Sequence, residues 1–334
     1  MASWYSYNRL LSYNIFMNMV MSPRGNGKSY GAKKIIIENY LKNGKQSVYV
    51  RRTKTELDGM KDKYWDDIAM NYPDLEFSVK GYQGFINGDL VIHFIPLSTS
   101  SQRKSDAFPH VTHMFFDEYV ITKTGHTHYL RNEMVLLLDL IETVFRKRTD
   151  SKVILMSNAV SYVNPLFDYY GIEPNPKLRF QRFHNKSILL ELFTDSVFIQ
   201  EKLETPFGKL IANTPYGNYA INNEVLEDTK DFLRRKKGVG YWCYMCEIKT
   251  LKYPVACWID SVTKDVYIDD KIDSHNDTRF TVLVEDSEEG YLNIKNYRHQ
   301  YPLKTIRQAF NEGKLFYKNQ SIKKHVGENI IRYI

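Results

Sequence analysis

The sequence contains few cysteines, and their spacing limits the sites that they can form. Three are present among 334 residues, at Cys243, Cys246 and Cys257. They cannot all pair as disulfides, and a reducing compartment would keep them free. Cys243 and Cys246 have zinc-ligand spacing, but no second pair follows, and only Cys257 and His275 could complete a site. We therefore expect thiols on apolar strands rather than a structural zinc ion.

Long apolar segments are also missing. No apolar run approaches the roughly 20 residues that a helix needs to cross a bilayer. The N-terminal region lacks the apolar core of a secretory signal peptide. The sequence therefore predicts a soluble, intracellular protein without a membrane partner, and a length of 334 residues favours two domains over one.

Acidic residues are slightly outnumbered by basic ones. The chain has 46 lysines and arginines against 39 aspartates and glutamates, which gives a net charge of +7 and an isoelectric point near 9.0. This balance favours a polyanionic partner, although both signs are abundant. One basic cluster is a candidate DNA-binding surface, with a solvated helix face as the other interpretation: Arg234, Arg235, Lys236 and Lys237.

The most informative motif is a glycine-rich loop between a predicted strand at 15–21 and a helical pattern that begins at Tyr30. Backbone N–H groups of such a loop, together with the helix dipole, form an anion site. Lys28 is expected to reach the β- and γ-phosphates of ATP, and the Ser29 hydroxyl to bind Mg²⁺. The common pattern opens with glycine, where this chain has serine. The candidate ATP-binding residues are Ser22, Pro23, Arg24, Gly25, Asn26, Gly27, Lys28 and Ser29.

An acidic pair follows a second buried strand. Residues 114–116 are continuously apolar, as in a parallel strand covered on both faces, and Asp117 and Glu118 come directly after them. Asp117 is placed to hold Mg²⁺, and Glu118 to polarise the attacking water. Alone, this string also fits a strand that ends in a solvated acidic turn. Together with the upstream loop, it predicts an ATPase site.

Strand and helix signals alternate through the first half of the chain. A helix is predicted over 30–43, ahead of Gly44 as its C-cap. Residues 51–54 leave the next predicted strand at the edge where ligands bind in open α/β sheets. Predicted strands cover residues 47–50, 85–94 as a hairpin turning at Asn87-Gly88, and 153–156. This alternation predicts an α/β fold with a mostly parallel sheet wrapped by helices.

The pattern changes after a segment that is dense in turn-forming residues. We expect an ATPase domain at 1–204, a linker or lid at 205–235 and a nucleic-acid-binding domain at 236–334. The last of these is predicted as α+β, with a helix at 302–311 that places Ile306 and Phe310 on one face. Its predicted strands cover residues 240–250, 255–259, 266–268 and 280–284.

The combination of motifs resembles the packaging ATPases of small tailed phages of the phi-29 type. The loop at 22–29, with its replaced first glycine and internal arginine, resembles their variant phosphate loop. Residues 115–119 resemble their acidic motif, and residues 156–159 resemble the motif that couples hydrolysis to movement, with Ser157 and Asn158 as its sensor residues. The resemblance covers residues 15–160 well and rests beyond them on length and a strand-rich second domain.

This resemblance implies a homo-oligomeric ring, expected to be a pentamer, that drives double-stranded DNA into an empty capsid. The ring would dock on the portal, or connector, of the procapsid in the host cytoplasm, with a structural packaging RNA as a further candidate partner, and would be absent from the mature virion. In such rings a neighbour's arginine completes each site. Arg146 is our choice for that residue and Arg148 the reserve, with Lys104 as a second trans-acting candidate.

The family's second domain resembles a ribonuclease-H-type nuclease, which is active in large terminases and shortened in the phi-29 type. A two-metal site needs acids that converge from separate strands, with the metals about 3.5–4 Å apart. The sequence neither demonstrates nor excludes this convergence, and we favour a vestigial, nucleic-acid-binding domain. The candidate acids are Glu247, Asp260, Asp265, Asp269 and Asp270.

Three other functions are compatible with parts of the sequence. One is a large terminase whose nuclease remains active, and another is a ring helicase or pilus-type motor, for which no strand-separating motif is evident. The third is a nucleotide-gated scaffold. Glu118 argues against the scaffold, because such a protein needs no water-activating acid.

Overall fold

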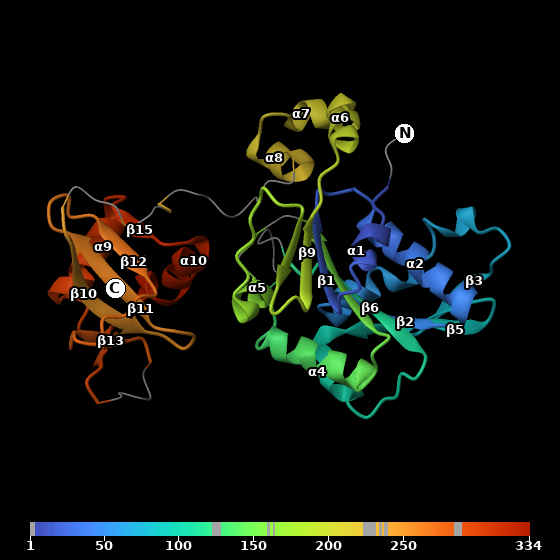
Figure 1. The fold of residues 1–334 in the computed structure, drawn as a ribbon, viewed down its shortest axis with the longest axis horizontal. Helices are drawn as coiled ribbons and strands as arrows, with labels where there is room; N and C mark the ends of the chain where they lie inside the picture. The colour runs from blue at the N-terminus through green and yellow to red at the C-terminus, as the bar shows by residue number, and fades with distance from the viewer. Residues whose placement is uncertain are drawn as a thin grey trace. The chain divides into compact units, whose positions relative to one another are not determined.

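The chain forms two compact units, Met1–Glu227 and Asp228–Ile334, which are described separately (Figure 1). The structure is a computed structural model. It describes residues 4–121, 128–158, 161–162, 164–222, 232–233, 236, 240–283 and 289–334.

A nine-stranded sheet forms the centre of the first unit (Figure 1). In spatial order its strands are β3 (Phe77–Lys80), β4 (Gln83–Ile86), β5 (Asp89–Pro96), β2 (Gln46–Arg51), β6 (Val111–Asp117), β7 (Lys152–Asn158), β1 (Met17–Ser22), β9 (Ile188–Leu192) and β8 (Phe180–Phe183). The six strands from β5 to β9 in this order pair in parallel, and the pairs that involve β3, β4 and β8 are antiparallel. The prediction of a mostly parallel sheet is confirmed.

Helices cover both faces of this sheet. They are α1 (Asn8–Ser12), α2 (Lys28–Asn43), α3 (Lys54–Asp58), α4 (Glu133–Phe145), α5 (Pro165–Tyr170), α6 (Ser196–Glu204), α7 (Pro206–Ile211) and α8 (Pro215–Asn222). Short 3₁₀ turns occupy Lys61–Lys63, Ala69–Asn71 and Leu97–Arg103. Helix α2 begins two residues before the predicted start and ends at Gly44, whose φ of 61° suits a glycine C-cap.

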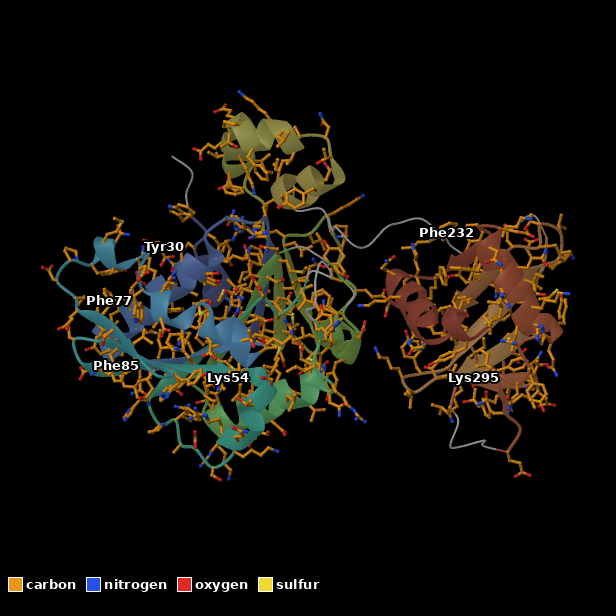
Figure 2. All side chains as sticks on the ribbon, turned by 180° about the vertical axis from the view of Figure 1, so that it is seen from behind. Tyr30, Lys54, Phe77, Phe85, Phe232 and Lys295 are labelled. Carbon is orange, nitrogen blue, oxygen red and sulfur yellow. The ribbon has the colours of Figure 1, made fainter. Side chains whose placement is uncertain are left out.

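Side chains of the central strands alternate between two apolar cores. In β1, Met19 and Met21 join the core that contains α4, whereas Val20 joins the core that contains α1 and α2. The predicted Asn87-Gly88 turn joins β4 to β5 and is confirmed, and Figure 2 labels Phe77 on the edge strand β3 and Phe85 on β4. Burial on both faces explains why the central strands are apolar without a gap.

The segment predicted as a linker or lid, 205–235, begins with two helices. Residues 206–222 form α7 and α8 and belong to the first unit. Thr205 caps α7 by accepting a hydrogen bond from the Gly208 N–H at 2.9 Å, and Pro206 occupies the first helical turn. A Thr-Pro pair is therefore a helix start here, because proline lacks only an N–H that the first turn leaves unpaired.

The second unit is a mixed six-stranded sheet with two helices and a final 3₁₀ turn at Ile331–Tyr333. Its strands, in order, are β14 (Leu292–Asn293), β13 (Arg279–Thr281), β10 (Trp242–Lys249), β11 (Val255–Asp260), β12 (Val266–Asp269) and β15 (Leu315–Tyr317). Helices α9 (Tyr301–Asn311) and α10 (Gln320–Asn329) pack their apolar residues against it. The predicted strand at 280–284 ends early, as β13, and residue 284 lies outside the described residues.

One detail of this unit corrects a sequence-based expectation. Ile306 is fully buried, but Phe310 is 50% exposed, because the buried face of α9 runs instead through Leu303 and Ile306. Cys246 and Cys257 face each other across β10 and β11 as buried free thiols, whereas Cys243 is exposed.

Among the described residues no group of three or more His, Cys, Asp or Glu side chains could hold a metal ion. In the part of the chain that the structure describes, no helix has the length and apolarity of a membrane span.

Candidate nucleotide-binding site

The strand order brings the phosphate-loop motif and the acidic pair to one edge of the sheet. β7 lies between β1 and β6, and all three strands run parallel, so their carboxyl ends meet. The loop follows β1, and the acidic pair closes β6. Gly25 and Gly27 have φ values of 84° and 89°, a conformation that side chains disfavour. A Cβ on Gly27 would also lie 2.6 Å from the Trp4 ring, so glycine is required there.

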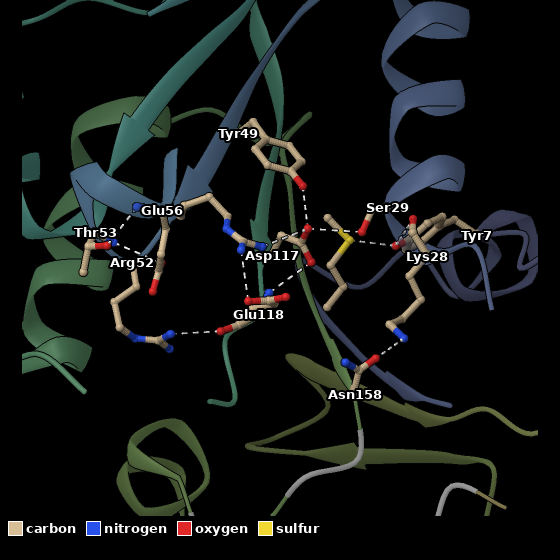
Figure 3. A network of polar contacts seen from close by, with 12 residues as sticks. Tyr7, Lys28, Ser29, Tyr49, Arg52, Thr53, Glu56, Asp117, Glu118 and Asn158 are labelled. Atoms are coloured by element: carbon tan, nitrogen blue, oxygen red, sulfur yellow. Dashed lines mark hydrogen bonds and ion pairs between the residues drawn. The ribbon is translucent and has the colours of Figure 1, made fainter. Parts of the chain in front are cut away.

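Lys28 is buried at the start of α2 and is held by oxygen atoms from two strand ends (Figure 3). Its Nζ donates to Ser22 Oγ at 2.8 Å, to the Pro23 carbonyl at 3.2 Å and to Asn158 Oδ1 at 3.1 Å. Burial lowers the Lys28 pKa to about 8, and Asp117 opposes that shift. A buried ammonium that lacks a close carboxylate partner favours an anion such as a phosphate.

Ser29 and Asp117 are placed together. The Ser29 hydroxyl donates to Asp117 Oδ2 at 3.1 Å, and the buried Tyr49 hydroxyl donates to the same oxygen at 2.6 Å (Figure 3). Asp117 is 8% exposed. A hydroxyl beside a carboxylate is the oxygen donor set that Mg²⁺ takes beside nucleotide phosphates, so these residues fit that ion.

Glu118 projects from the same turn and is paired with an arginine. Its side chain is 56% exposed, and Oε2 lies 3.0 Å from Arg51 Nη2. Arg51 Nη1 also lies 3.3 Å from Asp117 Oδ2, so one guanidinium contacts both acids. The Glu118 backbone has a φ of 58°, in the left-handed region. The carboxylate that would act on water is therefore aimed by a constrained turn.

A cavity of about 740 Å³ lies over this edge. Asn26 is 2% exposed, and neither atom of its side-chain amide has a hydrogen-bond partner among the described residues. Ser157 is buried and donates to the Asn158 carbonyl at 3.0 Å. Unpaired amide atoms beside a buried ammonium fit a polar, anionic ligand. The lining comprises Trp4, Arg24, Gly25, Asn26, Gly27, Lys28, Ser29, Tyr30, Asp67, Asn71, Asp117, Glu118, Ser157 and Asn158.

The three candidates for action on a neighbouring subunit lie elsewhere. Arg146 follows the last residue of α4 and donates to the Asp106 carbonyl at 3.3 Å, and Arg148 donates to the Pro109 carbonyl at 3.0 Å. Lys104 pairs with Asp139 at 2.9 Å. All three line a separate surface hollow near the start of β6, roughly 20 Å along α4 from the end that adjoins the acidic turn. The chain does not bring them to its own phosphate loop.

The candidate DNA-binding cluster is described only at Lys236. Its ammonium lies over the Trp258 ring, and burial lowers its pKa. Arg234, Arg235 and Lys237 lie outside the described residues.

Four of the five candidate nuclease acids each have a separate structural role. The buried Asp260 accepts hydrogen bonds from the Val262 and Thr263 amides in a turn, and Asp270 pairs with Lys318. Glu247 accepts from the Tyr291 hydroxyl at 2.7 Å, and Asp269 from the Trp258 indole at 2.9 Å. The described part of the chain therefore contains no assembled metal-binding acid cluster.

Three important contacts were not predicted from the sequence. Arg51 pairs with both acids, Arg52 donates to the backbone beyond them, and Lys202 of α6 donates to the Arg24 carbonyl at 2.7 Å. Arg51 is the last residue of β2, and Arg52 follows it directly. Because β2 and β6 are parallel neighbours, the position of residues 51–54 at the ligand edge was the signal that could have identified them.

The fold and the loop together define a P-loop ATPase-type domain followed by a smaller mixed domain. The family model of the podovirus DNA encapsidation protein (Gp16) matches residues 1–333. The chain therefore belongs to the podovirus DNA encapsidation protein family.

Relatives and solved structures agree with this assignment. The chain is 36% identical over 314 residues to the DNA packaging protein of Bacillus phage B103, covering 94% of this chain and 96% of that protein. It is 34% identical over 320 residues to the DNA packaging protein of Bacillus phage phi29, covering 96% of this chain and 95% of that protein. A chain of the bacteriophage phi-29 viral genome packaging motor assembly matches with a TM-score of 0.80 at 34% identity, covering 97% of this chain and 98% of that one. The N-terminal domain of the phi29 DNA packaging ATPase matches with a TM-score of 0.54 at 39% identity, over 58% of this chain and 98% of that domain.

Proposed function

We propose that this protein hydrolyses ATP to drive double-stranded DNA into an empty phage capsid as a subunit of a homo-oligomeric ring. The observation that carries the proposal is the grouping of Lys28, Ser29, Asp117 and Glu118 at one sheet edge, in a chain whose whole length matches a DNA encapsidation family. A large terminase with an active nuclease is less well supported, because four of the five candidate acids of the second unit are engaged separately.

Each residue of the site has a separate role in hydrolysis. Lys28 and the loop amides bind the phosphates, and Ser29 and Asp117 hold Mg²⁺, which when bound neutralises charge on the phosphates. Glu118 accepts a hydrogen bond from the attacking water and orients it. Asn158, which contacts Lys28 from the end of β7, is placed to respond to the presence of phosphate. Arg51 must release Glu118 before that carboxylate can act on water.

The ring and its other partners belong to the same proposal. We expect a pentamer that docks transiently on the portal of the procapsid in the host cytoplasm and leaves before the virion is mature, with a packaging RNA as a candidate component. The similarity to a chain of the phi-29 packaging motor assembly supports this arrangement. Cryo-electron microscopy of the protein bound to its procapsid, imaged with and without added RNA, tests each of these partners.

DNA affinity should be largely independent of sequence and should fall steeply with salt. Lysine and arginine contacts to phosphates release counterions, and the logarithm of affinity changes by about 0.9 per contact for each unit in the logarithm of salt concentration. Fluorescence anisotropy with labelled duplexes of unrelated sequence measures both properties. Replacing Arg234, Arg235, Lys236 and Lys237 with glutamine should make the slope shallower. A slope that those replacements leave unchanged would remove them from the interface.

Arg146 should act on the neighbouring subunit's nucleotide. An arginine finger in trans contributes roughly 10³–10⁵ in rate. Because the chain keeps Arg146 away from its own phosphate loop, Arg146→Ala should leave ATP binding by the monomer intact and remove the stimulation that assembly gives. Mixing Arg146→Ala with Glu118→Gln subunits should restore part of the hydrolysis, since some interfaces then pair an intact Glu118 with an intact neighbouring Arg146.

Confirmed mixed rings without any recovered hydrolysis would transfer the role from Arg146 to Arg148, Lys104 or Arg24. Lys147→Ala is the matched control, because it removes a neighbouring positive charge from the same surface hollow. It should retain the stimulation by assembly.

A further inference from the structure

Arg52 is a fully buried cation beside the acidic turn. It follows β2 directly, its side chain is 1% exposed, and its guanidinium lies 5.5 Å from the Phe116 ring centroid and 5.1 Å from that of Tyr129. Neither ring neutralises its charge. A buried charge of this kind persists only where carboxylate and carbonyl groups compensate it.

The compensation comes from one acid and two backbone carbonyls. Arg52 Nε and Nη2 donate to the two Glu133 carboxylate oxygens at 2.8 and 3.0 Å. Nη1 donates to the Glu118 carbonyl at 3.0 Å (Figure 3). Nη2 donates to the Tyr119 carbonyl at 2.8 Å. Glu133 is itself 5% exposed. The planar guanidinium thus joins the start of α4 to the backbone that carries the Glu118 side chain.

The Glu118 backbone needs such support because of its conformation. Its φ of 58° lies in the left-handed region, which a side chain disfavours and which persists only where the surroundings fix it. The Glu118 N–H donates to the Met156 carbonyl at 2.8 Å, and the Glu118 carbonyl accepts from Arg52. Both sides of the strained residue are therefore held, one by β7 and the other by Arg52.

We propose that Arg52 is a positioning residue for catalysis: it holds the Glu118 and Tyr119 carbonyls so that the Glu118 carboxylate is aimed at the attacking water, and Glu133 holds Arg52 in place. The inference rests on the proposed ATPase function. Among the described residues, the Arg52 side chain donates hydrogen bonds to Glu133 and to the backbone of the acidic turn, and to neither the phosphate loop nor the Glu118 carboxylate. Its loss should therefore lower kcat while the apparent KM for ATP stays at the wild-type value, because misplacing a catalytic group costs rate rather than ground-state binding.

The decisive variant is Arg52→Met/Glu133→Leu. Replacing both members of a buried ion pair with apolar residues of similar size is often neutral for stability, whereas removing one leaves an uncompensated charge. This double variant should therefore unfold at a temperature close to that of the wild type and bind a non-hydrolysable ATP analogue with Mg²⁺ as tightly. Its kcat should fall about tenfold to a hundredfold, since the two carbonyls lose their donors. Arg52→Lys keeps the positive charge but lacks the several N–H donors of the planar guanidinium, and it should give an intermediate kcat.

Arg179→Lys is the matched control. Arg179 pairs with the buried Glu191 at 2.7 Å in the same sheet, between aromatic rings, and touches neither the loop nor the acidic pair. The kcat of Arg179→Lys should match the wild-type value. In a Glu118→Gln background, Arg52→Met/Glu133→Leu should lower the residual rate no further, because the carboxylate that Arg52 aims is already gone.

Two results would overturn the proposal. One is a wild-type kcat in folded Arg52→Met/Glu133→Leu or, where that variant does not fold, in Arg52→Lys. The other is a loss of analogue binding that matches the loss of kcat, since this would make the pair a general structural support. A wild-type protein that does not hydrolyse ATP under the same conditions would instead refute the proposed ATPase function.

Discussion

Replacing Lys28 with alanine is expected to abolish both nucleotide binding and ATP turnover. The Lys28 ammonium is the buried cation of the phosphate loop, where its hydrogen-bond partners are the oxygens of Ser22, Pro23 and Asn158. Phosphate oxygens would compete for the same ammonium, and removing a charge placed against developing negative charge costs on the order of 10²–10³ in rate. Titration with a fluorescent ATP analogue and a phosphate-release assay measure the two losses.

Lys34→Ala is the control for this experiment. Lys34 lies in the same helix with a side chain that is 58% exposed, and its ion pair with Glu38 spans 3.9 Å. It should bind and hydrolyse ATP as the wild type does. The expected loss leaves well under a tenth of wild-type hydrolysis in Lys28→Ala. If this variant retains more than about a tenth, the nucleotide site lies elsewhere.

Glu118→Gln should separate binding from turnover. Glutamine keeps the shape of glutamate and its capacity for hydrogen bonding but is not a base, and general-base catalysis contributes about 10²–10⁴ in rate. Ser29 and Asp117, which make their own contact at 3.1 Å, are untouched by this change. The variant should therefore retain Mg²⁺-dependent nucleotide binding, lose hydrolysis, and accumulate as nucleotide-loaded rings that hold DNA without moving it.

Equilibrium binding and single-turnover hydrolysis, measured on the same preparation, report the two properties separately. Glu142→Gln is the control, because Glu142 lines the distant surface hollow and not the nucleotide cavity. An equal loss of nucleotide binding in Glu118→Gln and Lys28→Ala would contradict the assignment of separate roles to these residues.

Sequence reasoning is most direct where the geometry of the candidate site is local. The glycines at 25 and 27 must adopt positive φ, Lys28 and Ser29 must open the helix, and Asp117 must end a buried strand, so their spacing carries the geometry. The continuous apolar runs at β1, β6 and β7 also predict a parallel sheet with two covered faces. Such features are set by nearest neighbours along the chain and by strand burial.

Contacts that depend on strand order are less accessible to sequence reasoning. Arg51 ends β2 and Arg52 follows it, and both side chains carry the same guanidinium group. Arg51 contacts the Glu118 side chain, whereas Arg52 contacts the Glu118 backbone carbonyl. That difference arises from the alternation of side chains at the end of β2 and from the position of Glu133 on α4. The sequence around Arg51 and Arg52 does not indicate which group each of them contacts.

The turn-forming residues of 205–222 open helices for a related reason. Threonine followed by proline can open a helix or form a turn, and the choice depends on whether the following apolar residues find a core. Here Ile211, Ala220 and Ile221 join the core that contains α4, so helices form. Phe310 is the opposite case: it has the right spacing in α9, but the sheet beneath that helix covers only the face through Leu303 and Ile306.

The most direct test of the account is ATP-dependent protection of DNA by empty capsids. Purified protein, procapsids of the phage that encodes it, linear double-stranded DNA and Mg²⁺ are incubated with ATP or with a non-hydrolysable analogue, and the DNA that resists added nuclease is measured. Full-length protected DNA should accumulate with ATP and wild-type protein, and neither with the analogue nor with Lys28→Ala or Glu118→Gln. Equal protection with ATP and with the analogue would contradict an ATP-driven motor built on Lys28 and Glu118.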